Sequence, residues 1–71
     1  MIDTNLLREI IDRSGYKLKY VAEQLGITYY GLLKKINNET EFKASEINIL
    51  YNLLSMTEAE REAIFFTPNV D

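Results

Sequence analysis

Residues 21–36 constrain the fold more than any other part of the chain, because they combine a flexible corner with apolar anchors on both sides of it. Two short helices that cross steeply through a turn of three or four residues need a small residue where they touch and a residue free to take a positive φ at the corner. Ala22 and Gly26 meet these two needs. The apolar anchors are Val21, Leu25, Ile27, Leu32 and Ile36. The segment therefore predicts a helix-turn-helix, and the alternative is an ordinary helical hairpin without a ligand.

The rest of the chain repeats a pattern of capping residues followed by apolar residues at helical spacing. The expected N-terminal caps are Asp3, Thr4 or Asn5, then Thr28, Ser45 and Thr57, the last in a capping box with Glu60. The expected stops are Gly15, Gly26, the pair Asn37 and Asn38, and Pro68. We expect helices near residues 5–14, 17–25, 28–36, 45–54 and 58–66. The predicted fold class is all-α, a compact five-helix bundle that forms a single domain over residues 1–71.

Length and composition restrict the function classes. A chain of 71 residues closes one hydrophobic core and leaves no room for a second domain. It has no cysteine and no histidine, and it shows neither a glycine-rich phosphate loop nor a metal-ligand spacing, so we expect no enzyme activity, no metal and no cofactor. The longest apolar runs are far short of the roughly 20 residues that span a bilayer, and the start of the chain lacks the pattern of a signal peptide. The expected location is therefore the cytoplasm.

Charge is distributed unevenly along the chain. The net charge of -3 by itself argues against a nucleic-acid partner. Residues 13–43, however, hold six basic and three acidic residues, whereas residues 44–71 hold one basic and five acidic ones. The middle of the chain is thus suited to face a polyanion, and the C-terminal part is not.

From about residue 5 to residue 66, the order of five helices with the turn motif as the second and third resembles the lambda-repressor and Cro-like (XRE-type) family of phage and bacterial transcriptional regulators. The stretches 42–47 and 62–66 resemble those of small prophage-encoded members. The resemblance implies a lambda repressor-like DNA-binding domain, double-stranded operator DNA as the partner, a bacterial cytoplasmic location and a role in a lysogeny switch, with a homodimer on a two-fold operator.

The resemblance also implies the site. In that family the third helix lies in the major groove, and the start of the second helix and the loop after the third hold phosphates. Carried over by position, the base contacts are Thr28, Tyr29, Tyr30, Leu33 and Lys34. The phosphate contacts are Lys19, Lys35 and Asn37, with Lys17 and Lys43 as further candidates. Lysines neutralise phosphates, and Lys34 can also donate to guanine O6 and N7.

The residues predicted to contact bases depart from the family pattern, because base edges are usually read by Arg, Asn, Gln, Ser or Lys. Tyr29 and Leu33 lie four residues apart, with Tyr30 beside them, and so predict an aromatic and apolar stripe typical of protein interfaces. One alternative function is therefore a protein-binding modulator, such as an antirepressor that uses this surface to bind another repressor. A structural or toxin-neutralising partner is the third hypothesis.

The dimer prediction has its own basis in the sequence. Four apolar residues crowd the C-terminal end, namely Ile64, Phe65, Phe66 and Val70, and an apolar end of this sort is often a symmetric contact. The alternative is that Phe65 and a neighbour fold back onto the first and fourth helices.

Overall fold

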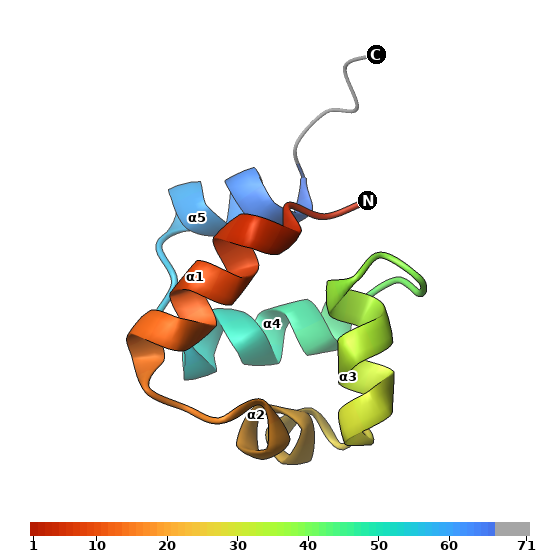
Figure 1. Cartoon of the computed structure of the whole chain (residues 1–71). Helices are drawn as coiled ribbons and strands as arrows, with labels where there is room; N and C mark the ends of the chain where they lie inside the picture. Colours follow the sequence, from red (N-terminus) through yellow and green to blue (C-terminus); the bar gives the residue numbers. More distant parts are fainter. Residues whose placement is uncertain (67–71) are drawn as a thin grey trace.

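The chain forms five helices within residues 1–66, the part that the computed structural model describes (Figure 1). They are α1 (Thr4–Ser14), α2 (Leu18–Leu25), α3 (Tyr29–Ile36), α4 (Ala44–Leu53) and α5 (Glu58–Phe65). No strand occurs in this range, so the all-α prediction is confirmed, with helix ends within one residue of those expected. Pro68 and Val70, which entered the predictions for the last helix and the dimer, lie outside the described residues.

The helix ends follow the expected local chemistry at most positions. The Asp3 carboxylate accepts a hydrogen bond from the Leu6 amide, and the Thr28 hydroxyl accepts one from the Gly31 amide at 2.9 Å. Gly15 and Gly26 end α1 and α2 with φ values of 80° and 71°. At the end of α3 the left-handed residue is Asn38, with φ 64°. These residues stop the helices because glycine and asparagine tolerate the left-handed conformation.

The predicted cap of the fourth helix is wrong. Ser45 is exposed within the first turn of α4, and Lys43 occupies the N-cap position. The Glu46 carboxylate accepts a hydrogen bond from the Lys43 backbone amide at 2.8 Å. A glutamate three residues into a helix can reach back to the N-cap amide, and Glu46 does so from a buried position. The helix therefore begins at Ala44 without a hydroxyl cap.

The core gathers side chains from all five helices. Figure 1 shows α4 in the middle of the molecule, with α1 and α5 on one side, α2 on the other and α3 at one edge. Helix α2 packs against α3 and α4, and α1 packs against α3 and α5. The buried apolar residues are Leu7, Ile10, Ile11, Val21, Ala22, Leu25, Leu32, Ile36, Leu50, Leu54, Met56 and Ile64. Burial of such side chains at about 25 cal/mol per Å² is the main force that holds short helices in place.

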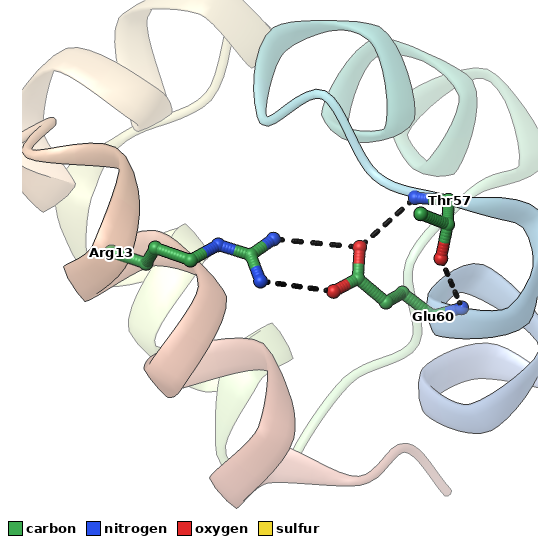
Figure 2. A network of polar contacts seen from close by, with 3 residues as sticks. All are labelled: Arg13, Thr57 and Glu60. Carbon is green, nitrogen blue, oxygen red and sulfur yellow. Dashed lines mark hydrogen bonds and ion pairs between the residues drawn. The ribbon is translucent and has the colours of Figure 1, made fainter.

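A polar network joins α1 to α5. Arg13 donates from both guanidinium ends to the Glu60 carboxylate, at 3.0 and 3.4 Å, and Glu60 also accepts from the Thr57 amide while its own amide donates to the Thr57 hydroxyl (Figure 2). The capping box predicted at the start of the last helix is therefore confirmed. The hydrogen bond from Arg13, together with that from Thr57, lowers the pKa of Glu60.

The N-terminal segment is tied to the rest of the fold by its backbone. The Asp3 amide donates to the Ile64 carbonyl at 2.9 Å. The Asn38 side chain accepts from the Ile2 amide at 2.7 Å and donates to the Ile2 carbonyl at 3.2 Å. The loop after α3 and the end of α5 are therefore both joined to the segment before α1. None of the helices in residues 1–66 has the length and apolar character that a bilayer span needs.

The corner between α2 and α3 gives a test of the fold. At Gly26 an added Cβ would meet no atom within 4 Å, so the positive φ is what opposes a substitution. We expect Gly26→Val to lower the free energy of unfolding by at least roughly 1–2 kcal/mol, and Gly26→Asn to lower it by less, because asparagine tolerates this conformation. Urea denaturation of the two variants measures the difference. Equal stability of the valine variant and the parent would contradict the observed turn.

Candidate functional site

Helices α2 and α3 form a unit whose inner faces are fixed by burial. Residues 26–28 connect them, and the Ile27 amide donates to the Ala22 carbonyl at 3.1 Å across the corner. Leu32 and Ile36 of α3 are completely buried, and α2 buries Val21, Ala22 and Leu25. Because these contacts fix one side of α3, its other side faces outward at the edge of the molecule (Figure 1).

The outward face of α3 carries most of the predicted contact residues. Tyr30 is 75% exposed and Tyr29 is 45% exposed, and their rings meet edge to face with centroids 6.1 Å apart. Thr28, Lys34 and Asn37 are also exposed, whereas Leu33 is half-buried. The structure therefore brings the two tyrosines and Lys34 together on one helix, with Leu33 at the border of that face.

Three of the predicted phosphate-binding lysines are exposed, two at the start of α2 and one after the loop that follows α3. Lys17 is the N-cap residue of α2, and its side chain makes no capping hydrogen bond. The first backbone amides of this helix are therefore not capped by a side chain. Lys17 and Lys19 are exposed at this end, and Lys43 is exposed beyond the loop that follows α3. Free amides and lysines at one helix start favour an anion.

Lys35 has partners inside the protein. Its ammonium lies 3.1 Å from a Glu46 carboxylate oxygen and donates to the Glu41 carbonyl at 2.9 Å, and the side chain is only 13% exposed. The contacts join α3 to α4 and to the loop between them. The predicted phosphate role of Lys35 conflicts with this internal pairing, so Lys35 is not part of the exposed surface of α2 and α3.

The electrostatics of Glu46 follow from the same contacts. Burial by itself raises the pKa of this carboxyl, but the hydrogen bonds from the Lys43 amide and from Lys35, with the charges of both lysines, outweigh it. The net result is a pKa below the ordinary value of 4.5. Glu46 is thus ionised at neutral pH in the folded protein and acts as the anion that both caps α4 and holds Lys35.

Two features of the α2–α3 unit were not predicted from the sequence, one at the end of α3 and one at the start of α2. Arg8 of α1 donates to the Asn37 side chain at 3.4 Å, which places a further cation at the C-terminal end of α3. Tyr16 and Tyr20, each 40% exposed, lie at the start of α2 with ring centroids 5.0 Å apart and ring planes tilted by 40°. The spacing of four residues could have indicated the tyrosine pair, whereas the Arg8 contact depends on the packing of α1 against α3.

The C-terminal end of α5 bears on the dimer prediction. Ile64 is completely buried, and Phe65 packs edge to face on Phe42 with centroids 5.6 Å apart. Phe66 is 55% exposed. Of the described residues proposed for a symmetric contact, only Phe66 is strongly exposed, and Phe65 folds back onto the loop that precedes α4.

Comparison of the chain with protein-family models, with curated proteins and with solved structures gave no match. Residues 1–66 also contain no group of three acidic, histidine or cysteine side chains placed to hold a metal ion. The candidate site is therefore the exposed surface of α2 and α3 itself.

The neighbours Lys34 and Lys35 differ in their surroundings and so provide a matched test. Lys35→Met leaves the buried Glu46 carboxylate without its cation, and we expect the free energy of unfolding to fall by about 1–3 kcal/mol. Lys34→Met removes an exposed charge and should change stability by less than about 0.5 kcal/mol. Denaturant unfolding of both variants at neutral pH measures this, and equal destabilisation would contradict the assigned roles.

The lowered pKa of Glu46 predicts an acid dependence. Its folded pKa lies below the unfolded one, so its contribution is complete above about pH 4.5 and disappears as the pH falls through the folded pKa. We expect the stability of Glu46→Gln to fall less steeply in acid than that of the parent. Unfolding free energies measured over a pH series test this. The variant should keep some acid dependence, because the pKa of Glu60 is also lowered. Parallel curves would refute the assignment.

Proposed function

We propose that the chain is a small transcriptional regulator of the lambda-repressor and Cro-like kind, which binds duplex DNA through α2 and α3 as a helix-turn-helix. The observation that carries this proposal is an α3 anchored by two completely buried residues, with Tyr30 and Lys34 outward on the opposite side and the half-exposed Tyr29 at the border of that face. An α-helix with its side chains is about 10–12 Å in diameter. The major groove is about 12 Å wide and admits one helix.

Each exposed group has a stated part in this proposal. Lys34 donates to guanine edges, and the hydroxyl groups of Tyr29 and Tyr30 bond to bases or phosphates while their rings meet thymine methyl groups. Thr28 caps α3 and lies at the tip of the helix that enters the groove. Leu33, being half-buried, contributes apolar contact only at the border of the face.

Phosphate contacts on both sides of α3 would fix its position in the groove. At the start of α2, Lys17 and Lys19 flank amides that no side chain caps, and such a helix start binds phosphate. At the other end, Asn37 and the neighbouring Arg8 supply donors, with Lys43 further along the chain. Contacts of this kind determine register and much of the affinity without reading sequence.

A second candidate function is supported by the aromatic character of the same face. Two adjacent tyrosines at 45% and 75% exposure are unusual for a groove reader, and tyrosine is enriched at the centres of protein interfaces. In this candidate, the face of α3 binds a partner repressor and prevents that repressor from binding its operator.

Removal of one lysine from α2 and one from α3 tests the DNA-binding candidate. The double variant Lys19→Ala, Lys34→Ala should bind a mixed-sequence duplex more weakly at low salt, because backbone neutralisation does not depend on sequence. Its plot of log affinity against log salt should be less steep by about 0.9 for each phosphate that the variant no longer neutralises. Mobility shift or fluorescence anisotropy over a salt series gives both quantities.

The matched control is Arg13→Gln, Arg61→Gln, which removes the same charge from α1 and α5 and should leave the salt slope unchanged. If the lysine variant and the control weaken binding equally, only net charge matters and the α2–α3 surface is not the DNA site. If the lysine variant binds DNA as tightly as the parent, DNA binding through this unit is contradicted and the protein-binding candidate is favoured. Tyr30→Ala is the variant that tests that second candidate, because it removes the most exposed tyrosine of α3.

A further inference from the structure

The side chains of α3 include few groups that distinguish one base edge from another by hydrogen bonds. Residues 29–36 contain no carboxylate and no side-chain amide, the groups that read cytosine and adenine in the major groove. Lys35 is turned inward, where it pairs with Glu46. Of the charged side chains in α3, a helix that lies wholly within residues 1–66, only Lys34 is exposed. The helix therefore has one strong donor, which suits guanine.

The polar residues at the two ends of α3 already have partners inside the protein. The Thr28 hydroxyl accepts a hydrogen bond from the Gly31 amide at 2.9 Å, and the Asn37 side-chain oxygen accepts one from Arg8 at 3.4 Å. The tyrosine hydroxyl groups of α3 can each donate or accept. A hydroxyl group that does both finds a partner on any of the four base pairs, so it does not select one by itself. Hydrogen bonds from this face therefore discriminate little beyond guanine.

Aromatic and aliphatic surface makes up much of the rest of this face. Tyr30 is 75% exposed and lies four residues before Lys34, so the two side chains are neighbours on the helix. The Tyr29 ring contacts the Tyr30 ring edge to face, with centroids 6.1 Å apart, and the half-buried Leu33 adds aliphatic atoms at the border. In the major groove, the apolar group that marks a base pair is the C5-methyl of thymine.

We propose that α3 selects duplex DNA by the C5-methyl groups of its pyrimidines, with the Tyr30 ring as the specificity-determining contact and Lys34 on a neighbouring guanine. This inference rests on the proposed DNA binding through α2 and α3. 5-Methylcytosine carries its methyl group on the same ring carbon as thymine, and this carbon faces the major groove. The face therefore accepts 5-methylcytosine in place of a contacted thymine, and C5 methylation of a cytosine at that position raises the affinity of the site.

Duplexes that differ only in methyl groups test this. A sequence is first enriched from a randomised duplex pool by binding to the full chain, and it is then synthesised with uracil in place of thymine, which removes the methyl groups and keeps the base pairing. We expect the uracil duplex to bind more weakly by about fourfold for each methyl group in contact. At the thymine where a single uracil weakens binding most, 5-methylcytosine paired with guanine should bind about fourfold more tightly than cytosine.

Three variants at exposed positions separate the ring from the hydroxyl group and from the charge. Tyr30→Ala should bring the ratio of thymine-duplex to uracil-duplex affinity close to one, whereas Tyr30→Phe keeps the ring and should keep the ratio. Lys34→Ala should weaken the binding of both duplexes and lower the salt slope, but the ratio should stay as in the parent. Substitutions of exposed side chains change stability little, so all three variants are expected to fold.

The outcomes distinguish this inference from the proposed function on which it rests. Equal affinity for the thymine and uracil duplexes, an unchanged ratio in Tyr30→Ala, or 5-methylcytosine that binds no better than cytosine overturns the methyl recognition. A pool that binds with a salt-dependent affinity but yields no enriched sequence overturns it too, and leaves DNA binding through α2 and α3 in place. A chain that binds no duplex at low salt overturns both and favours the protein-binding candidate.

Discussion

The contact on which the site most depends is the pairing of Lys35 with Glu46. The Glu46 carboxylate, on a residue that is 5% exposed, receives the ammonium of α3 at 3.1 Å and the backbone amide that begins α4 at 2.8 Å. A buried anion with two such donors orients both helices, because its desolvation is compensated only when both are in place. Lys35 also binds the Glu41 carbonyl, so the loop between the helices has its path fixed by the same two side chains.

This pairing helps to sort the residues of α3 into two groups. Lys35 and the buried pair Leu32 and Ile36 hold the helix against the protein, while Tyr29, Tyr30 and Lys34 remain for a partner. The opposite end of the molecule is held by Arg13 and Glu60, where the capping box and the ion pair share one carboxylate (Figure 2). The α3 surface is therefore presented by a scaffold joined at two separate polar points.

The acidic balance of the whole chain does not decide its partner. Two of the acidic residues, Glu46 and Glu60, have their charge matched by cations within the fold, and Glu58 and Glu60 lie in the first turn of α5, where they complement the helix dipole. Lys17 and Lys19 stay exposed at the start of α2. The cations of the proposed DNA surface are thus open to solvent, whereas the guanidinium of Arg61 stacks on the Tyr51 ring.

The sequence by itself determined the helices, their glycine and threonine boundaries, and the buried faces of α2 and α3, because these depend on side chains three or four residues apart. Gly26, Thr28 and the Thr57–Glu60 box were predicted from such local patterns and were observed. The roles of Lys35 and Glu46, the contact of Arg8 with Asn37 and the stacking of Arg61 on Tyr51 were decided only by tertiary structure. Lys34 and Lys35 are chemically identical neighbours, and only the position of α4 relative to α3 makes one a buried partner and leaves the other exposed.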